Sequence, residues 1–318
     1  MRLSPEMQAR LRDNAPLATL IVLVLLVGVF SPSFLEANTL MLLAADTATL
    51  FIMGAGLTFV IMVGGIDLSV QAIASLASVV MAATLPTIGA LAVPLALLSG
   101  IVGGLISGFA QTRLRIPSFI STLAVSGIAV AAALMFSGTR SVPIPPEMRG
   151  TVLAFAAARS FGIPNDILVA VVVLIGSLFV ERRTVFGRWS VAVGAGEPAA
   201  LVAGVPVNRV KVIALTISGG LSALAGVVMG ARLSSGSPTL ANEFLLPAVA
   251  AVCVGGTALT GGVGSVARTL IGALIVSVVR IGMTFVGVDP FAQQIVFGAV
   301  LVLAVAATID RSKIPIVK

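Results

Sequence analysis

The sequence contains no histidine and no tyrosine, and it has one cysteine, Cys253, in 318 residues. Without histidine there is no imidazole to act as a general base, a metal ligand or a member of a catalytic triad. A single cysteine excludes an internal disulfide and a cysteine cluster for a metal ion. Only serine–lysine or paired-carboxylate chemistry remains for an enzyme. We therefore expect that the chain is not an enzyme and holds no metal.

Charged residues are also scarce. They make up 10% of the chain, whereas an average soluble domain has about 25%. Several apolar runs exceed the ~20 residues that cross a bilayer, and they do not alternate as the strands of a barrel do. We expect an all-α, multi-pass protein of the inner or plasma membrane, in contact with membrane lipid. The first run, Leu17–Phe30, lacks a convincing cleavage site and is expected to be a transmembrane helix rather than a signal peptide.

Breaks in hydropathy predict about ten spans in one transmembrane domain, residues 1–318. The predicted spans are 16–31, 38–64, 66–86, 88–111, 117–137, 165–181, 211–230, 245–262, 265–286 and 291–309.

The basic residues predict the orientation of these spans. The net charge is +7, and we interpret the excess as anchoring loops in the cytoplasm rather than as a nucleic-acid surface. With the N-terminus inside, the outer loops hold only Arg140, Arg149, Arg159 and Arg232, while Arg280 lies within a span. All other basic residues then lie on the inner side. We therefore expect both termini in the cytoplasm and no nucleic-acid partner.

Two long loops and a glycine pattern suggest how the spans are organised. The predicted inner loop, residues 181–211, divides the spans into five and five, which would suit an inverted repeat, although the sequence shows none. The predicted outer loop covers residues 137–166. Small residues at four-residue spacing allow helix backbones to approach closely. They occur at Gly100, Gly104, Gly108, Gly226 and Gly230.

A polar stretch, MVGGIDLSVQ at residues 62–71, interrupts a strongly apolar region. Its glycines are expected to end one helix, and Asp67 or Ser69 to cap the next by accepting a backbone N–H. Two interpretations are open: an ordinary turn at the cytoplasmic surface, or a break within the membrane that lines a passage. The candidates for a translocation path in this stretch are Gly64, Gly65, Asp67, Ser69 and Gln71.

Asp46 lies well inside a predicted span. An intramembrane carboxylate costs about 2.5–3.5 kcal/mol on insertion scales, so Asp46 is expected to face the bundle interior, protonated or paired. It forms either a buried interhelical hydrogen bond or part of a substrate path. Further polar candidates are Ser121, Thr122, Asn242 and Glu243.

The inner loop contains a predicted short helix in AVGAGEPAALVAGVPVNRVK. Glu197 and Pro198 are a typical helix start, and Gly204 followed by Pro206 is a typical stop. The residues of this element are Glu197, Pro198, Ala199, Ala200, Leu201, Val202, Ala203 and Gly204. Such a short helix is not stable alone in water. It packs either on its own bundle or in a groove of a cytoplasmic partner.

A second glycine-rich region, residues 248–275, predicts a close-packed or re-entrant turn. It lacks the flanking strand and the lysine of a phosphate-binding loop. GxxxxGK[ST] occurs nowhere in the chain, so no ATPase site is expected here.

Four ordered stretches resemble the permease subunits of carbohydrate-type ABC importers, the ribose/xylose/galactose group. They are GGIDLSV (64–70), LRIPSFISTLA (114–124), TVFGRWSVAVGAGEPAALVAGVPVNRVK (184–211) and VGGTALTGGVGSVARTLIGALI (254–275). The resemblance covers nearly the whole chain and implies a ten-helix fold similar to vitamin B12-type (type II) permeases. It also implies that residues 197–204 form the coupling helix and that GGIDLS borders the translocation path. Where the family usually has glycine after GGIDLSV, this chain has Gln71.

The resemblance further implies transport by alternating access, for a monosaccharide or related polyol. Two permeases, identical or paralogous, would form the pore, and a soluble sugar-binding protein would deliver the substrate from outside. Cytoplasmic ABC ATPase subunits would bind ATP-Mg, so the permease itself would need no cofactor. The main alternative is an ion-coupled secondary transporter of a small polar solute, which would use carboxylates near broken helices.

Overall fold

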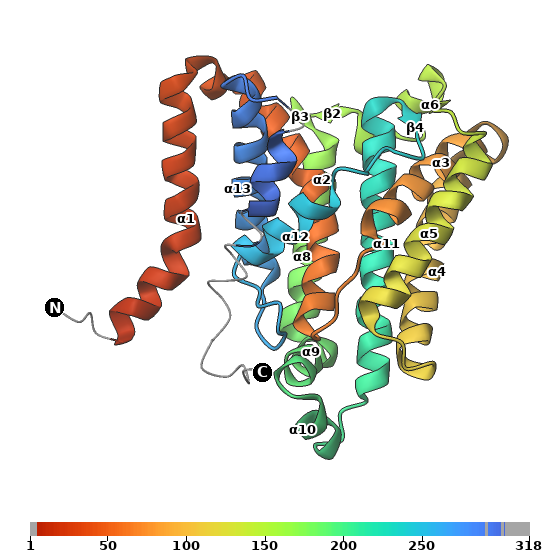
Figure 1. The fold of residues 1–318 in the computed structure, drawn as a ribbon. Helices are drawn as coiled ribbons and strands as arrows, with labels where there is room; N and C mark the ends of the chain where they lie inside the picture. Colours follow the sequence, from red (N-terminus) through yellow and green to blue (C-terminus); the bar gives the residue numbers. More distant parts are fainter. Residues whose placement is uncertain (1–4, 290–291, 300–301, 303–318) are drawn as a thin grey trace.

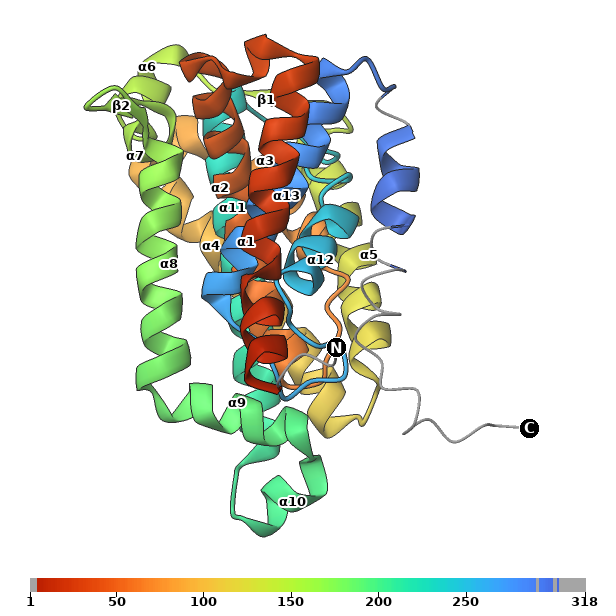
Figure 2. The same cartoon turned by 90° about the vertical axis from the view of Figure 1, so that its left-hand side faces the viewer.

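The computed structural model describes residues 5–289, 292–299 and 302. Helices dominate and stand side by side in a bundle, with a short helical arm at one end (Figure 1). The arm consists of α9 (Val185–Ala195) and α10 (Glu197–Val202), and Figure 2 shows it from a second side.

The long helices are α1 (Pro5–Phe30), α2 (Ala37–Met62), α3 (Val70–Ile88), α4 (Ala92–Arg113), α5 (Ser118–Ser137), α8 (Asn165–Arg183), α11 (Val207–Leu233) and α13 (Val266–Phe285). The shorter ones are η1 (Pro32–Leu35), η2 (Gly89–Leu91), α6 (Pro146–Gly150), α7 (Ala154–Ala157) and α12 (Leu245–Val254). Two antiparallel pairs of two-residue strands lie at the end opposite α10 (Figures 1 and 2). They are β1 (Val142–Pro143) with β4 (Ser235–Gly236), and β2 (Arg159–Ser160) with β3 (Ile163–Pro164).

Among the described residues, 5 stretches are long and apolar enough to cross a membrane. They are Ala37–Met62, Val70–Arg113, Ser118–Ser137, Val207–Leu233 and Val266–Phe285. The second stretch contains two helices, because Gly89 has φ +56° and η2 separates α3 from α4, which pack against each other. The chain is therefore a multi-pass helical membrane protein.

Two predicted spans differ from what the structure describes. Residues 245–262 were expected to form one span, but the helix α12 has only 10 residues. It ends at Val254 because Gly256, Gly261 and Gly262 all have positive φ, from +77° to +88°. Of the predicted span 291–309, the structure describes residues 292–299 and 302, which are helical, and the other residues lie outside the described part of the chain.

The core of the bundle is built around α2 and α11. Every residue from Ala45 to Val63 is buried, and α2 contacts α8, α11, α12 and α13. On the other side, α11 packs on α3 and α4. The predicted glycine contacts are confirmed here: a Cβ at Gly104 would overlap the Leu215 carbonyl, and one at Gly108 would lie 2.8 Å from the Val212 Cα. The two helices therefore touch through their backbones.

Candidate functional site

An extended segment, residues 63–69, joins α2 to α3. In Figure 1 it is the orange trace that climbs from the lower end of α2, beside α9, to the start of α3 inside the bundle. The N–H groups of Gly64 and Gly65 donate to the carbonyls of Ile61 and Val60 and end α2, and Gly64 has φ +76°. The predicted helix break is confirmed. Because the chain re-enters the bundle, this geometry favours a break at membrane depth over an ordinary surface turn.

Hydroxyl groups on α5 satisfy the backbone of this extended segment. The N–H of Ile66 donates to Ser118 Oγ at 3.0 Å, and the N–H of Leu68 donates to Thr122 Oγ1 at 3.1 Å. Ser118 and Thr122 lie one turn apart at the start of α5. Irregular backbone at this depth requires such partners, since lipid offers none. Ser121, the other polar candidate of this helix, donates instead to the Ser118 carbonyl within α5.

Asp67 fixes the segment to the centre of the bundle. Its Oδ1 accepts hydrogen bonds from the Ser69 N–H at 2.8 Å and the Ser69 hydroxyl at 2.6 Å. Its Oδ2 accepts from the Ser218 hydroxyl of α11 at 2.7 Å, and Asp67 is 2% exposed. Asp67 therefore accepts a backbone N–H as expected, whereas the Ser69 side chain donates rather than caps. Gln71 follows on α3, half-buried, and its Oε1 has no hydrogen-bond partner.

Asp67→Ala should reduce transport on the order of tenfold or more, because the Ser69 and Ser218 hydroxyls would lose their acceptor in a buried site. Asp67→Asn keeps an oxygen for Ser69 and offers an amide to Ser218, so we expect uptake within about threefold of wild type. Uptake would be measured per amount of inserted protein. Normal uptake by the alanine variant at normal abundance would leave the stretch as a turn without a role in transport.

A second irregular segment, residues 234–244, joins α11 to α12. It starts at Ser234, which has φ +58°. The Ser237 N–H donates to Ser78 Oγ at 3.2 Å, and the Ala241 N–H donates to Ser75 Oγ at 3.0 Å. Both hydroxyls belong to α3, so the helix that follows the first irregular segment supports the second.

Two of the predicted path residues lie in this second segment. Asn242 and Glu243 are both exposed, immediately before the buried Phe244 that precedes α12. These two residues therefore belong to a different segment of the chain from the candidates between Gly64 and Gln71. The structure brings Gly64, Gly65, Asp67, Ser69 and Gln71 together as one unit.

Three glycine-bearing segments meet at the end of the bundle that carries α9. The Gly262 N–H donates to the Met62 carbonyl at 2.9 Å. A Cβ on Gly261 would lie 2.9 Å from the Gly64 nitrogen and 3.1 Å from the Gly194 Cα. A Cβ on Gly194 would overlap the Met62 carbonyl oxygen and the Gly262 nitrogen. We call these glycines, Gly64, Gly194, Gly261 and Gly262, the glycine junction. It brings α9 into backbone contact with the end of α2 at Met62 and with the α12–α13 loop, and this loop in turn touches the 63–69 segment at Gly64.

The predicted short helix α10 is confirmed at Glu197–Val202, 6 residues long. Pro198 lies in its first turn, and the chain stops beyond Ala203 at Gly204, which has φ +80°. Glu197 forms an ion pair with Lys211 of α11 at 2.6 Å.

The apolar side chains of α10 are divided between the protein and its surroundings. Ala200 is buried, while Leu201 is 57% exposed and Val202 is 91% exposed. Figures 1 and 2 place α10 at the extreme end of the molecule. The helix thus presents apolar surface away from its own bundle.

Asp46 is buried and paired. It forms an ion pair with Arg280 of α13, and the Arg232 guanidinium of α11 lies 3.8 Å away. Arg232 also lies 3.7 Å from Asp166 of α8, and Arg280 stacks 4.8 Å above the Phe244 ring. The structure therefore favours the interpretation of Asp46 as part of a buried interhelical ion pair over that of a free carboxylate in a substrate path. The sequence signal for the partner was Arg280, a basic residue well inside the predicted span 265–286.

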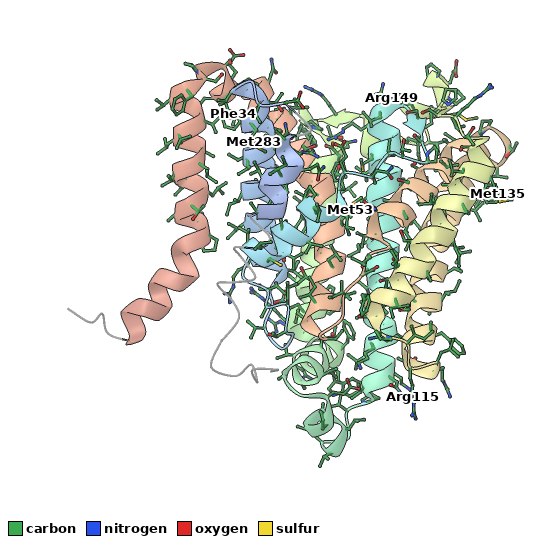
Figure 3. All side chains as sticks on the ribbon, in the orientation of Figure 1. Phe34, Met53, Arg115, Met135, Arg149 and Met283 are labelled. Carbon is green, nitrogen blue, oxygen red and sulfur yellow. The ribbon has the colours of Figure 1, made fainter. Side chains whose placement is uncertain are left out.

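This ion-pair cluster lies beside a cavity of about 420 Å³ near the end opposite α10, and its Arg232 and Asp166 line the cavity. Arg149 lines this cavity and donates to the Arg232 carbonyl at 3.4 Å. Figure 3 shows Arg149 at that end and Arg115 at the other.

Long apolar helices, a broken helix held inside the bundle and a short exposed helix at one end define a multi-pass membrane permease. The chain belongs to the family described as branched-chain amino acid transport system / permease component, whose sequence model matches residues 39–305.

Curated relatives resemble nearly the whole chain. The ribose import permease protein RbsC of Escherichia coli K12 is 34% identical over 309 residues, covering 96% of each chain. RbsC of Bacillus subtilis 168 is 36% identical, covering 94% of this chain and 92% of the relative. The fructose import permease protein FrcC of Rhizobium meliloti is 35% identical, covering 95% and 87%.

Proposed function

We propose that this chain is the transmembrane permease subunit of an ATP-driven ABC importer for a monosaccharide or related polyol. The observation that carries the proposal is α10, a short helix whose Leu201 and Val202 side chains project from the tip of the molecule. The family description names branched-chain amino acids, whereas the relatives cited above carry ribose and fructose as their named substrates. Identity over almost the full length supports the sugar class.

The proposed architecture is a type II permease bundle of about ten helices in one domain, residues 1–318, with both termini in the cytoplasm. The end of the bundle that carries α10 would face the cytoplasm. Its basic residues support this orientation, since Arg182, Arg183 and Arg209 flank α9 and α10 and Arg188 lies within α9. The start of α1 lies toward the same end of the molecule in Figure 1.

The proposed partners are a cytoplasmic ABC ATPase that receives α10, a second permease copy that completes the pore, and a soluble sugar-binding protein outside. ATP-Mg would be bound by the ATPase, and the permease would supply no cofactor and no chemistry. A movement of α10 would pass through α9 to the glycine junction. From there it would reach the end of α2 and the α12–α13 loop, whose backbones contact α9, and through them the 63–69 segment.

The alternative, an ion-coupled transporter, needs an intramembrane carboxylate that is free to exchange an ion. Asp46 is the predicted candidate, and its ion pair with Arg280 opposes that role. Asp67 is likewise engaged, because both of its oxygens accept hydrogen bonds, three in all.

Reconstitution separates the two mechanisms. The permease, its ATPase and its binding protein would be placed in proteoliposomes, and uptake of labelled ribose and fructose would be followed. We expect uptake that requires ATP hydrolysis and persists when an uncoupler collapses the ion gradients. A hydrolysis-deficient ATPase is the control. Uptake that continues without nucleotide but stops with the uncoupler would replace our proposal by the ion-coupled mechanism.

A further inference from the structure

A groove of about 460 Å³ runs along the outside of the seam between α4 and α11. The two helices approach closely along this seam, since a Cβ on Gly108 of α4 would lie 2.8 Å from the Val212 Cα of α11. The groove lies toward the helix ends that share one side of the bundle with α10, since α4 ends at Arg113 and α11 begins at Val207.

The inner part of the groove is apolar. Leu105 and Phe109 line it from α4, one turn apart, and Val212 and Ile213 line it from α11. Three of these side chains are well exposed: Leu105 at 45%, Phe109 at 58% and Ile213 at 42%. The α4 residues belong to a stretch that is apolar enough to cross a membrane. This wall therefore lies at the depth of lipid acyl chains.

The outer part of the groove is polar and positive. Arg113 closes it from the last turn of α4, and Arg209 from the first turn of α11, with Thr112 and Asn208 beside them. The lining contains no acidic residue. Within the described part of the chain, Arg113 and Arg209 both remain exposed and have no carboxylate within ion-pair distance.

We infer that this groove binds one anionic phospholipid. Its phosphate would lie between the Arg113 and Arg209 guanidiniums, and one acyl chain would lie along Leu105, Phe109 and Ile213. Guanidinium groups match the geometry of a phosphodiester, and basic pockets between helices at the cytoplasmic side suit anionic headgroups. A purely apolar protein segment could cover the inner, apolar part of the groove, but it would leave Arg113 and Arg209 without an anionic partner. Only the assignment of this groove to the cytoplasmic leaflet rests on the proposed function.

Lipid binding by the purified full chain would be measured by native mass spectrometry with phosphatidylglycerol and phosphatidylcholine. The test variant is Arg113→Gln with Arg209→Gln. The matched control is Arg182→Gln with Arg183→Gln, which removes two exposed charges at the end of α8 on the same side of the bundle. We expect phosphatidylglycerol affinity to fall on the order of tenfold in the test variant, with little change in the control. Phosphatidylcholine should bind weakly to all three proteins.

Further measurements distinguish a bound lipid from other occupants of the groove. Glycerol 3-phosphate, a headgroup without acyl chains, should not displace phosphatidylglycerol, and Phe109→Gln should weaken lipid binding. Equal losses in the test and control variants would overturn the inference. Displacement by glycerol 3-phosphate would overturn it in favour of a site for a small anion. Loss of the bound lipid when the ATPase is added would overturn it in favour of a protein contact. None of these readouts depends on transport, so failure here is distinct from failure of the proposed function.

Discussion

Valine at position 194 should abolish sugar uptake while the protein still inserts into the membrane. A Cβ on Gly194 would overlap the Met62 carbonyl oxygen and the Gly262 nitrogen, which are backbone atoms of two other segments. Overpacking of this kind typically costs 1–3 kcal/mol, and backbone atoms cannot rotate aside as a side chain can. The side chain would drive α9 away from the glycine junction. We expect uptake to fall by at least about a hundredfold.

The matched control for this variant is Gly176→Val. Gly176 is also a helix glycine, in α8, and a Cβ there meets nothing within 4 Å. Uptake, membrane abundance and stimulation of the ATPase by the sugar-loaded binding protein would be measured together. Gly194→Ala already places a Cβ against these backbone atoms, so we expect most of the loss of uptake with alanine as well. Full uptake by the valine variant would show that α9 does not need contact with Met62 for transport.

Elements defined by local signals could be predicted from the sequence. The start of α10 at Glu197–Pro198 and its stop at Gly204 follow from residue types that act within one or two turns. The break after Val63 follows from two adjacent glycines. The four-residue glycine spacing on α4 likewise predicts a close helix contact whatever the partner helix is.

The partners of these elements could not be predicted, because they are distant in sequence. Ser118 and Thr122 accept hydrogen bonds from N–H groups that lie 52 and 54 positions away in the sequence. Ser218 lies 151 positions from Asp67. Arg280 is 234 positions from Asp46. In the sequence, a serine or threonine of an apolar helix gives the same signal in two cases: its hydroxyl can bond to a carbonyl one turn earlier in its own helix, or to the backbone of another segment. Only the packing of the bundle decides which.

Hydropathy also failed at α12, and for a physical reason. Residues 245–262 are apolar throughout much of their length, so the window predicts a span. The structure ends the helix after 10 residues and continues as a loop. Hydropathy counts apolar residues and does not register backbone conformation, so it misses the loop that the positive φ of Gly256, Gly261 and Gly262 imposes here.

The two irregular segments are supported in similar ways by unrelated residues. In both cases a long helix, α2 or α11, is followed by an irregular segment and then by another helix. The two long helices run in opposite directions in Figure 1. Hydroxyls of α5 support the first segment, and hydroxyls of α3 support the second. Any hydroxyl at the right height meets the same backbone requirement, so similar supports do not require similar sequences.

Val202→Asp should separate the permease from its proposed ATPase without disturbing the permease itself. Val202 is 91% exposed, so the substitution removes almost no contact within the chain. A buried apolar anchor at an interface is commonly worth about 2 kcal/mol or more, which is roughly a thirtyfold change in Kd. A charge in its place adds a desolvation cost. We expect the ATPase to be lost on co-purification, uptake to fall by more than about tenfold, and thermal stability of the isolated permease to stay unchanged.

Other positions of α10 give a less direct test, because their effects are mixed. Ala200 is 4% exposed, so a bulky residue there would disturb the packing of α10 on its own bundle as well as any docking. Glu197 pairs with Lys211 while its side chain is 48% exposed, and exposed pairs contribute little.

The control for Val202 is Phe161→Asp. Phe161 is fully exposed between β2 and β3, at the end of the molecule opposite α10, and it already has φ +55°, which aspartate tolerates. Both variants place a carboxylate on an exposed apolar position, so a general effect of charge would weaken ATPase retention in both. Loss of the ATPase in Val202→Asp alone would identify α10 as the docking element. Retention of the ATPase with full uptake would mean that the energy of hydrolysis enters the bundle elsewhere.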